Sequence, residues 1–193
     1  MKPSKNFNTR KLVLLALLTA IVIILQFLGA FIRFGPFSIS LVLMPIVVGA
    51  ALIGIYAGGW LGLTFGFVVL LTGDANPFLA INPAAAVAVV LLKGMLAGLV
   101  AGAAYNLSAK KSKTIAAIIA ALICPIVNTG VFLAGAYIFF LPTLKEWGAA
   151  AGYTNAAAYV LLGLAGANFL VELCINLVLS PAIIRLIQYR SKL

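Results

Sequence analysis

Apolar residues fill six long runs of this chain, and the short segments between the runs hold most of the charged residues. Most runs reach the ~20 residues that a helix needs to cross a bilayer, and none shows the period-two alternation of a lipid-facing β-strand. The pattern predicts an all-α membrane protein, a compact bundle of six transmembrane helices. The runs cover residues 12–32, 39–56, 59–72, 83–105, 115–141 and 156–187.

The second and third runs are short and rich in glycine. One of them can therefore be tilted, broken or partly re-entrant, a conformation that a membrane allows only where protein covers the backbone. Their boundaries are the least defined of the six.

Charge predicts how the bundle is oriented. The chain is 65% hydrophobic and only 8% charged, with a net charge of +10. Most basic residues lie before the first run, between the fourth and fifth, and after the last, so six spans place all of them on one face. The positive-inside rule makes that face cytoplasmic, with both termini inside. Because these residues are not gathered on a soluble module, the charge does not indicate nucleic-acid binding.

The sequence predicts one transmembrane substrate-binding domain over residues 1–193, with short basic cytoplasmic tails at 1–11 and 188–193. The longest outer connections, 73–82 and 142–155, are too short for a folded domain. The chain has no G-x-x-x-x-G-K-[ST] phosphate loop, so energy, if the protein uses any, would have to come from a partner or an ion gradient.

Catalysis and metal binding have little support in the composition. The chain contains no histidine and only three acidic residues, which leaves no paired carboxylates for acid–base or metal chemistry. Cys124 and Cys174 lie within predicted spans and form no CxxC pattern, which predicts neither a disulfide nor a metal site. We expect a protein that is not an enzyme and that carries no cofactor.

Polar side chains near the middle of three apolar runs are the main candidates for chemistry. Lys93, Asn128 and Glu172 lie at similar depth in the fourth, fifth and sixth runs, and Asn168 and Asn176 share the helical stripe of Glu172. Such groups are costly in hydrocarbon, so each is expected to face a partner or a ligand. A purely structural Lys93–Glu172 ion pair is the alternative. A ligand site is favoured, because apolar packing could replace such a pair at little cost.

Two predicted outer loops add candidates at the mouth of the bundle. Arg33 and Phe37 belong to the first outer loop and Asn82 to the second. Aromatic, amide and arginine side chains there suit a lid over a small polar ligand that contains a ring. The aromatic residues Phe34, Phe37 and Phe78 are equally explained as interfacial anchors.

Residues 82–84 read Asn-Pro-Ala, the triplet of aquaporins. That fold requires two such triplets, each capping a half-helix. The nearest second candidate, Ser-Pro-Ala at 180–182, differs at its first residue, and no later helix completes a repeat. A water channel is therefore disfavoured.

Small residues recur at every fourth position of several predicted helices. Such ridges let helix backbones approach closely, so most of them predict packing inside the bundle. The ridges are Ala16 and Ala20, then Gly58, Gly62 and Gly66, and then Gly94, Gly98 and Gly102.

Over nearly its whole length the chain resembles the membrane-embedded substrate-binding S components of energy-coupling factor (ECF) vitamin transporters. The size and the six predicted spans contribute to the resemblance, as does the glycine-rich third run. The matching segments are TRKLVLLALLTA at 9–20, LMPIVVG at 43–49, LKGMLAG at 92–98 and PIVNT at 125–129.

The resemblance implies a binding subunit of an ABC importer, multi-pass in the prokaryotic plasma membrane. It would capture a vitamin or related micronutrient outside and deliver it through a transmembrane coupling subunit driven by two cytoplasmic ATPases. Ala16 and Ala20 correspond to the family's Ala-x-x-x-Ala contact with the coupling subunit. The family's pocket lies toward the outer half, between helices four to six under the first outer loop.

The resemblance does not identify the substrate, because these proteins share a fold but bind different vitamins. Lys93 and Arg33 could hold a carboxylate, as in pantothenate or folate, and Glu172 could accept hydrogen bonds from an amine or hydroxyl. A flavin-type ligand or cobalamin stays open. The alternative from another class is a self-sufficient secondary transporter or channel for a small polar solute.

Overall fold

The computed structural model describes residues 9–31, 33–34, 37–38 and 41–190 of the 193-residue chain; within these ranges, the side chains of 33–34, 37–38, 167–168, 180–184 and 186–190 are not described. The elements in chain order are α1 (Thr9–Gly29), β1 (Arg33–Phe34), β2 (Phe37–Ser38), α2 (Leu43–Leu52), α3 (Ile55–Thr72), α4 (Asn76–Leu79), α5 (Pro83–Ser108), α6 (Lys113–Ala150), α7 (Ala156–Ala158), the π-helix η1 (Tyr159–Gly166) and α8 (Ala167–Arg190).

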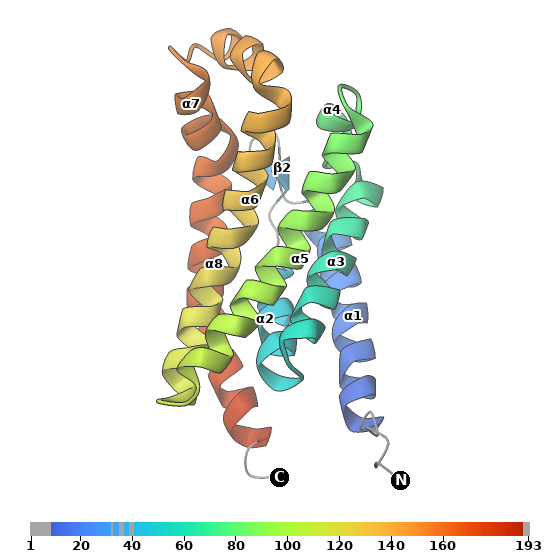
Figure 1. Ribbon diagram of the computed structural model, residues 1–193, viewed down its shortest axis with the longest axis vertical. Coiled ribbons are helices and arrows are strands. Elements are labelled where there is room, and N and C mark those ends of the chain that lie inside the picture. The colour runs from blue at the N-terminus through green and yellow to red at the C-terminus, as the bar shows by residue number, and fades with distance from the viewer. Residues whose placement is uncertain (1–8, 32, 35–36, 39–40, 191–193) are drawn as a thin grey trace.

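The described part of the chain is a helical bundle, as the apolar runs predict. Its two short strands form an antiparallel hairpin. Five helical segments are long and apolar enough to cross a membrane, and the second predicted span is the shorter helix α2. The start of α1, the α5–α6 turn and the end of α8 lie at one end of the bundle (Figure 1). The six-span count and the cytoplasmic side of the termini stay predictions.

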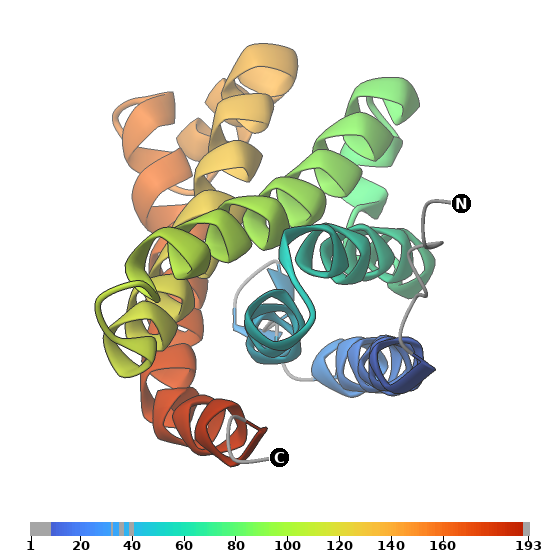
Figure 2. The same cartoon turned by 60° about the horizontal axis from the view of Figure 1, so that its bottom comes forward.

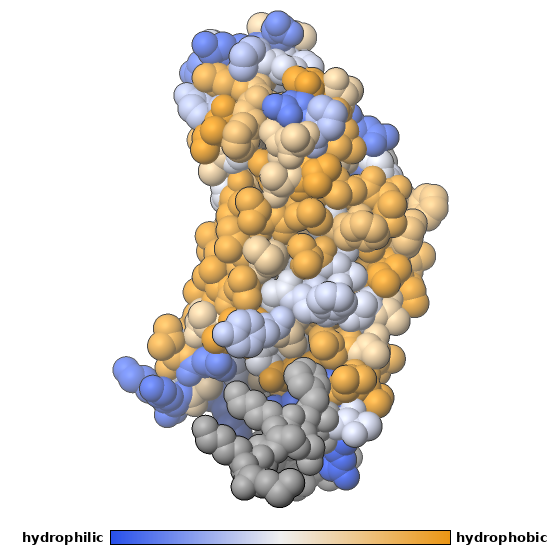
Figure 3. Space-filling model, turned by 45° about the vertical axis from the view of Figure 1, so that its right-hand side comes forward, coloured by the Kyte–Doolittle hydropathy of each residue, from blue (hydrophilic) through white to orange (hydrophobic). Residues whose placement is uncertain are grey.

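Five helices form the wall of the bundle, and α2 packs against all of them. Along the wall α1 contacts α3, α3 contacts α5, α5 contacts α6, and α6 contacts α8. The helix α2 contacts α1, α3, α5, α6 and α8 and lies between α1 and α8 when the bundle is viewed toward its lower end (Figure 2). The face shown in Figure 3 is mainly apolar over the middle of the molecule, with hydrophilic residues near its ends. This surface suits a lipid environment.

The helix α2 is too short to cross a bilayer by itself. Its 10 residues correspond to ~15 Å, about half of a ~30 Å hydrocarbon core. Seven of the eight residues from Leu43 to Ala50 are buried, so the protein covers a helix end that lipid would not tolerate. The chain reverses at Gly54, whose φ is 136°, a backbone conformation that glycine adopts readily because it has no Cβ atom. The third helix therefore begins at Ile55, before the predicted start at residue 59.

Glycine brings α3 and α5 into backbone contact. A Cβ atom added to Gly62 would overlap the carbonyl of Gly94, and one added to Gly98 would overlap the carbonyl of Gly58. The two glycine ridges thus face each other, and their predicted role in packing within the bundle is confirmed.

The long helix α6 differs from the prediction at its outer end. The sequence places an outer connection at 142–155, but α6 continues to Ala150. Pro142 lacks an N–H, and its ring clashes with the carbonyl four residues earlier, so the helix bends rather than ends, with non-helical dihedral angles at Phe140 (φ −128°, ψ 15°). Most of the expected loop is therefore helix.

Candidate functional site

A cavity lies inside the wall, in the part of the bundle that α2 does not fill. The space between its lining residues is about 660 Å³, a volume that includes open solvent at the mouth. The lining comes from every wall helix, from α4, from η1 and from the turn after α3, but not from α2. The lining residues are Gln26, Val69, Asp74, Ala75, Phe78, Val90, Lys93, Asn128, Thr129, Phe132, Leu164, Ala165, Phe169 and Glu172.

Lys93 reaches the cavity from the middle of α5. Its Nζ atom lies 5.3 Å from the ring centroid of Phe65 and 5.4 Å from that of Phe132, so two aromatic faces stabilise the ammonium. Among the described side chains, however, no ion pair joins Lys93 to Glu172. The N–H groups of Lys93 can therefore donate to a bound molecule.

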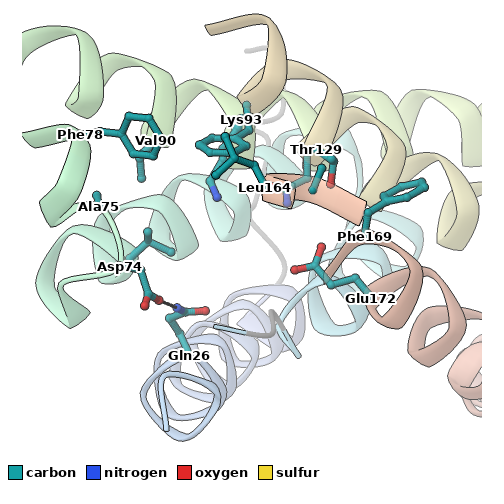
Figure 4. Close-up of a pocket in the computed structure, with 14 residues that line it drawn as sticks. Gln26, Asp74, Ala75, Phe78, Val90, Lys93, Thr129, Leu164, Phe169 and Glu172 are labelled. Carbon is teal, nitrogen blue, oxygen red and sulfur yellow. Dashed lines mark hydrogen bonds between the residues drawn. The ribbon is translucent and has the colours of Figure 1, made fainter. Parts of the chain in front are cut away.

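Asn128 and Glu172 bring polar atoms to the same cavity from α6 and α8. Asn128 is 4% exposed and Glu172 is 5% exposed. The carboxylate of Glu172 points into the cavity, toward the side on which Lys93 lies (Figure 4). The three polar residues singled out in the sequence thus line one cavity. Asn176, on the same stripe, is buried outside the lining and donates its side-chain N–H to the Glu172 backbone carbonyl at 2.9 Å.

Aromatic side chains form the outer wall of the cavity. Among the described residues, the ring of Phe78 on α4 meets the edge or face of three rings, with centroid distances of 5.7 Å to Phe132, 4.9 Å to Phe140 and 5.6 Å to Trp147. Phe78 is 4% exposed. It therefore packs inside the protein, and the alternative of an interfacial anchor does not apply to it.

Asn82, a predicted site residue, lies outside the cavity. It is exposed, does not line the cavity, and caps the start of α5, where its Oδ1 accepts a hydrogen bond from the backbone N–H of Ala85 at 3.1 Å. This geometry is that of an ordinary helix N-cap followed by proline at the first helical position. The Asn-Pro-Ala triplet thus has a local structural explanation.

Three predicted site residues have side chains outside the described part. Arg33 and Phe37 belong to the hairpin strands, where Arg33 pairs with Ser38 and Phe34 pairs with Phe37. Asn168 lies in the first turn of α8. Their proposed contacts with a substrate stay predictions.

Ala16 and Ala20 lie away from the cavity. Both side chains are exposed on α1, among exposed apolar neighbours such as Leu12, Val13 and Leu17. They are thus accessible on an outer face of the bundle.

Two polar lining residues were not among the sequence candidates, although both left a signal. Gln26 interrupts the first apolar run in the same way that Lys93 interrupts the fourth. Asp74 is one of three acidic residues in the chain. Because Asp74 lies in a predicted loop, the sequence did not indicate that it lines the cavity. Only the fold places that turn over the interior of the bundle.

A helical membrane bundle around a cavity with aromatic walls and a few convergent polar groups is a membrane-embedded binding protein. The family model "ECF transporter, substrate-specific component" matches residues 10–184. The chain therefore belongs to this family of transporter components, as its resemblance predicts, and the family is not one of enzymes.

One solved structure with the same fold is that of ThiT from Listeria monocytogenes. The two chains share 24% sequence identity with a TM-score of 0.68, and the match covers 97% of this chain and 98% of that chain. At this identity the likeness supports the fold. A comparison with curated proteins gave no match.

Proposed function

We propose that this protein is the high-affinity binding subunit of an ECF-type importer, which captures a vitamin or related micronutrient outside a prokaryotic cell. The observation that carries the proposal is the convergence of Lys93, Asn128 and Glu172 on one cavity, in a chain of the ECF substrate-specific family. Polar groups at membrane depth are costly and mark functional sites by default. Delivery would require a transmembrane coupling subunit and two cytoplasmic ATPases.

The cavity combines two kinds of recognition. Its apolar and aromatic lining, with Phe78, Phe132 and Phe169, suits a ring or a hydrocarbon chain. Lys93 would hold a carboxylate or another acceptor, while Glu172 would accept hydrogen bonds from an amine or hydroxyl. Arg33 and Phe37 would cover the bound molecule from the first outer connection.

The proposed partner surface is separate from the cavity. Ala16 and Ala20 present small side chains on the exposed face of α1. Small residues let another helix approach closely in a membrane, where van der Waals packing rather than hydrophobic burial holds helices together. We propose that the coupling subunit docks on this face.

A ligand-binding assay tests the proposal directly. The purified protein, without ATP, is screened by thermal shift against pantothenate, folate, riboflavin, thiamine, biotin, pyridoxine and cobalamin. One compound should raise the melting temperature, because a ligand at 1,000 times its Kd adds about 4 kcal/mol of stability. Calorimetry then gives its affinity.

Two results would reject the proposal. One is the absence of any shift across the panel together with failure of coupling and ATPase subunits to co-purify from the native host. The other is solute uptake into liposomes by this chain alone, abolished when an ion gradient is dissipated. That second result would establish a self-sufficient transporter instead.

A further inference from the structure

Gln26 is a buried amide that faces the candidate binding site from α1. Its side chain is 1% exposed and lines the cavity, and its Oε1 atom has no hydrogen-bond partner among the residues that the structure describes. A buried carbonyl oxygen without a partner costs about 1–3 kcal/mol, so such a group in a folded protein requires an explanation. A bound molecule that donates to this oxygen would provide one.

The orientation of the amide follows from its other contact. The Nε2 atom of Gln26 donates to Oδ2 of Asp74 at 3.3 Å, and the Thr72 hydroxyl lies 3.4 Å from the same oxygen. The donor of this bond is the amide nitrogen, so the nitrogen of Gln26 faces Asp74 and the amide oxygen faces away from it. In Figure 4 the Gln26 oxygen lies on the far side of the amide nitrogen from Asp74. Asp74 thus fixes Gln26 as an acceptor.

A second acceptor of the same kind lines the cavity on another helix. The Oδ1 atom of Asn128 on α6 is also buried, and no described residue forms a hydrogen bond with it. Gln26 and Asn128 therefore bring unsatisfied carbonyl oxygens from α1 and α6 to one space, and apolar side chains make up much of the remaining lining. This arrangement is complementary to a molecule that carries two N–H or O–H groups on an apolar framework.

We propose that Gln26, held by Asp74, is a specificity-determining residue that accepts a hydrogen bond from an amine, amide or hydroxyl group of the substrate. Asn128 accepts a second such bond. The inference rests on the proposed function and narrows the substrate to a small molecule with at least two donor groups. The competing explanation is that the Gln26–Asp74 bond only ties α1 to the turn after α3.

The test compares Gln26→Leu with a matched control, Asn176→Leu. Asn176 is also 1% exposed and has an unpartnered Oδ1, but it does not line the cavity. The probes are the vitamin of the panel that stabilises the wild-type protein and its derivatives in which each N–H or O–H is methylated in turn. Affinities are measured by calorimetry, and folding by thermal unfolding.

The expected result is a coupling between one substituent and one residue. Gln26→Leu should bind the parent vitamin about tenfold more weakly, the loss expected for one buried hydrogen bond. One methylated derivative should show a similar loss with the wild-type protein and no further loss with Gln26→Leu, because the two changes remove the same bond. Asn176→Leu should keep the wild-type ranking of all probes.

Other results overturn the inference in distinguishable ways. Equal affinity of Gln26→Leu and wild type would remove Gln26 from the site and leave the proposed function intact. A uniform loss for the parent and every derivative would show that Gln26 only supports the fold. Failure of the wild-type protein to bind any panel vitamin, together with failure of coupling and ATPase subunits to co-purify from the native host, would reject the proposed function and this inference with it. If Gln26→Leu does not fold, Gln26→Asn, whose side chain is shorter, is measured in its place. It should show the same loss for the parent vitamin and the same lack of further loss for one methylated derivative.

Discussion

Replacement of Gly62 by alanine should separate α3 from α5 and destabilise the protein. The added Cβ atom would overlap the carbonyl of Gly94, which is backbone and cannot rotate away as a flexible side chain would. The adjacent Lys93 carries the ammonium into the cavity, so displacement of α5 should also weaken substrate binding. Gly130→Ala is the matched control, because nothing lies within 4 Å of its added Cβ on α6.

The magnitude follows from two opposing effects. Alanine in place of a helical glycine gains about 1 kcal/mol in helix propensity. Forcing a methyl group into close-packed structure costs about 1–3 kcal/mol, and the backbone obstacle at Gly62 favours the upper end of that range. The net loss should be about 2 kcal/mol. For a protein of this size that corresponds to a melting temperature lower by about 4–8 °C.

Thermal unfolding in detergent, followed by intrinsic fluorescence, measures the effect. Gly130→Ala should melt at the wild-type temperature or a few degrees above it, since it gains propensity and meets no neighbour. If Gly62→Ala proves as stable as Gly130→Ala, the close contact between α3 and α5 does not limit stability, and the reasoning fails.

The other predictions concern binding and coupling. Glu172→Gln should weaken vitamin binding ten- to a hundredfold in calorimetry, because a hydrogen bond to a charged group contributes about 1.5–3 kcal/mol; unchanged affinity would exclude this carboxylate from the site. Lys93→Met keeps the chain length and removes the charge, so binding of a carboxylate-bearing vitamin should fall at least tenfold. Lys145→Met, at an exposed lysine, should not alter that affinity, and equal effects of the two lysine variants would contradict the assignment. Ala16→Leu with Ala20→Leu should abolish uptake in cells that contain the coupling subunit and the ATPases, while purified protein still binds the vitamin; intact uptake would remove these residues from the coupling face.

Hydropathy predicted most of the helices because lipid imposes a simple requirement on sequence. Each spanning segment needs ~20 apolar residues with its hydrogen bonds made internally, and that requirement is visible along the chain. The prediction from hydropathy was wrong where a helix is surrounded by protein instead of lipid. The helix α2 is half the expected length because other helices bury it, and α6 continues through Pro142 with a bend.

The sequence also identified Lys93, Asn128 and Glu172, since a polar group within an apolar run stands out without any knowledge of the fold. Gln26 carried the same signal, but its use could not be inferred until α1 was placed beside the turn that bears Asp74. The pattern of apolar and polar residues along the chain does not show which helix ends lie next to each other. That information comes from packing: α2 contacts every wall helix without lining the cavity, and the space it leaves is enclosed by aromatic rings and buried amides.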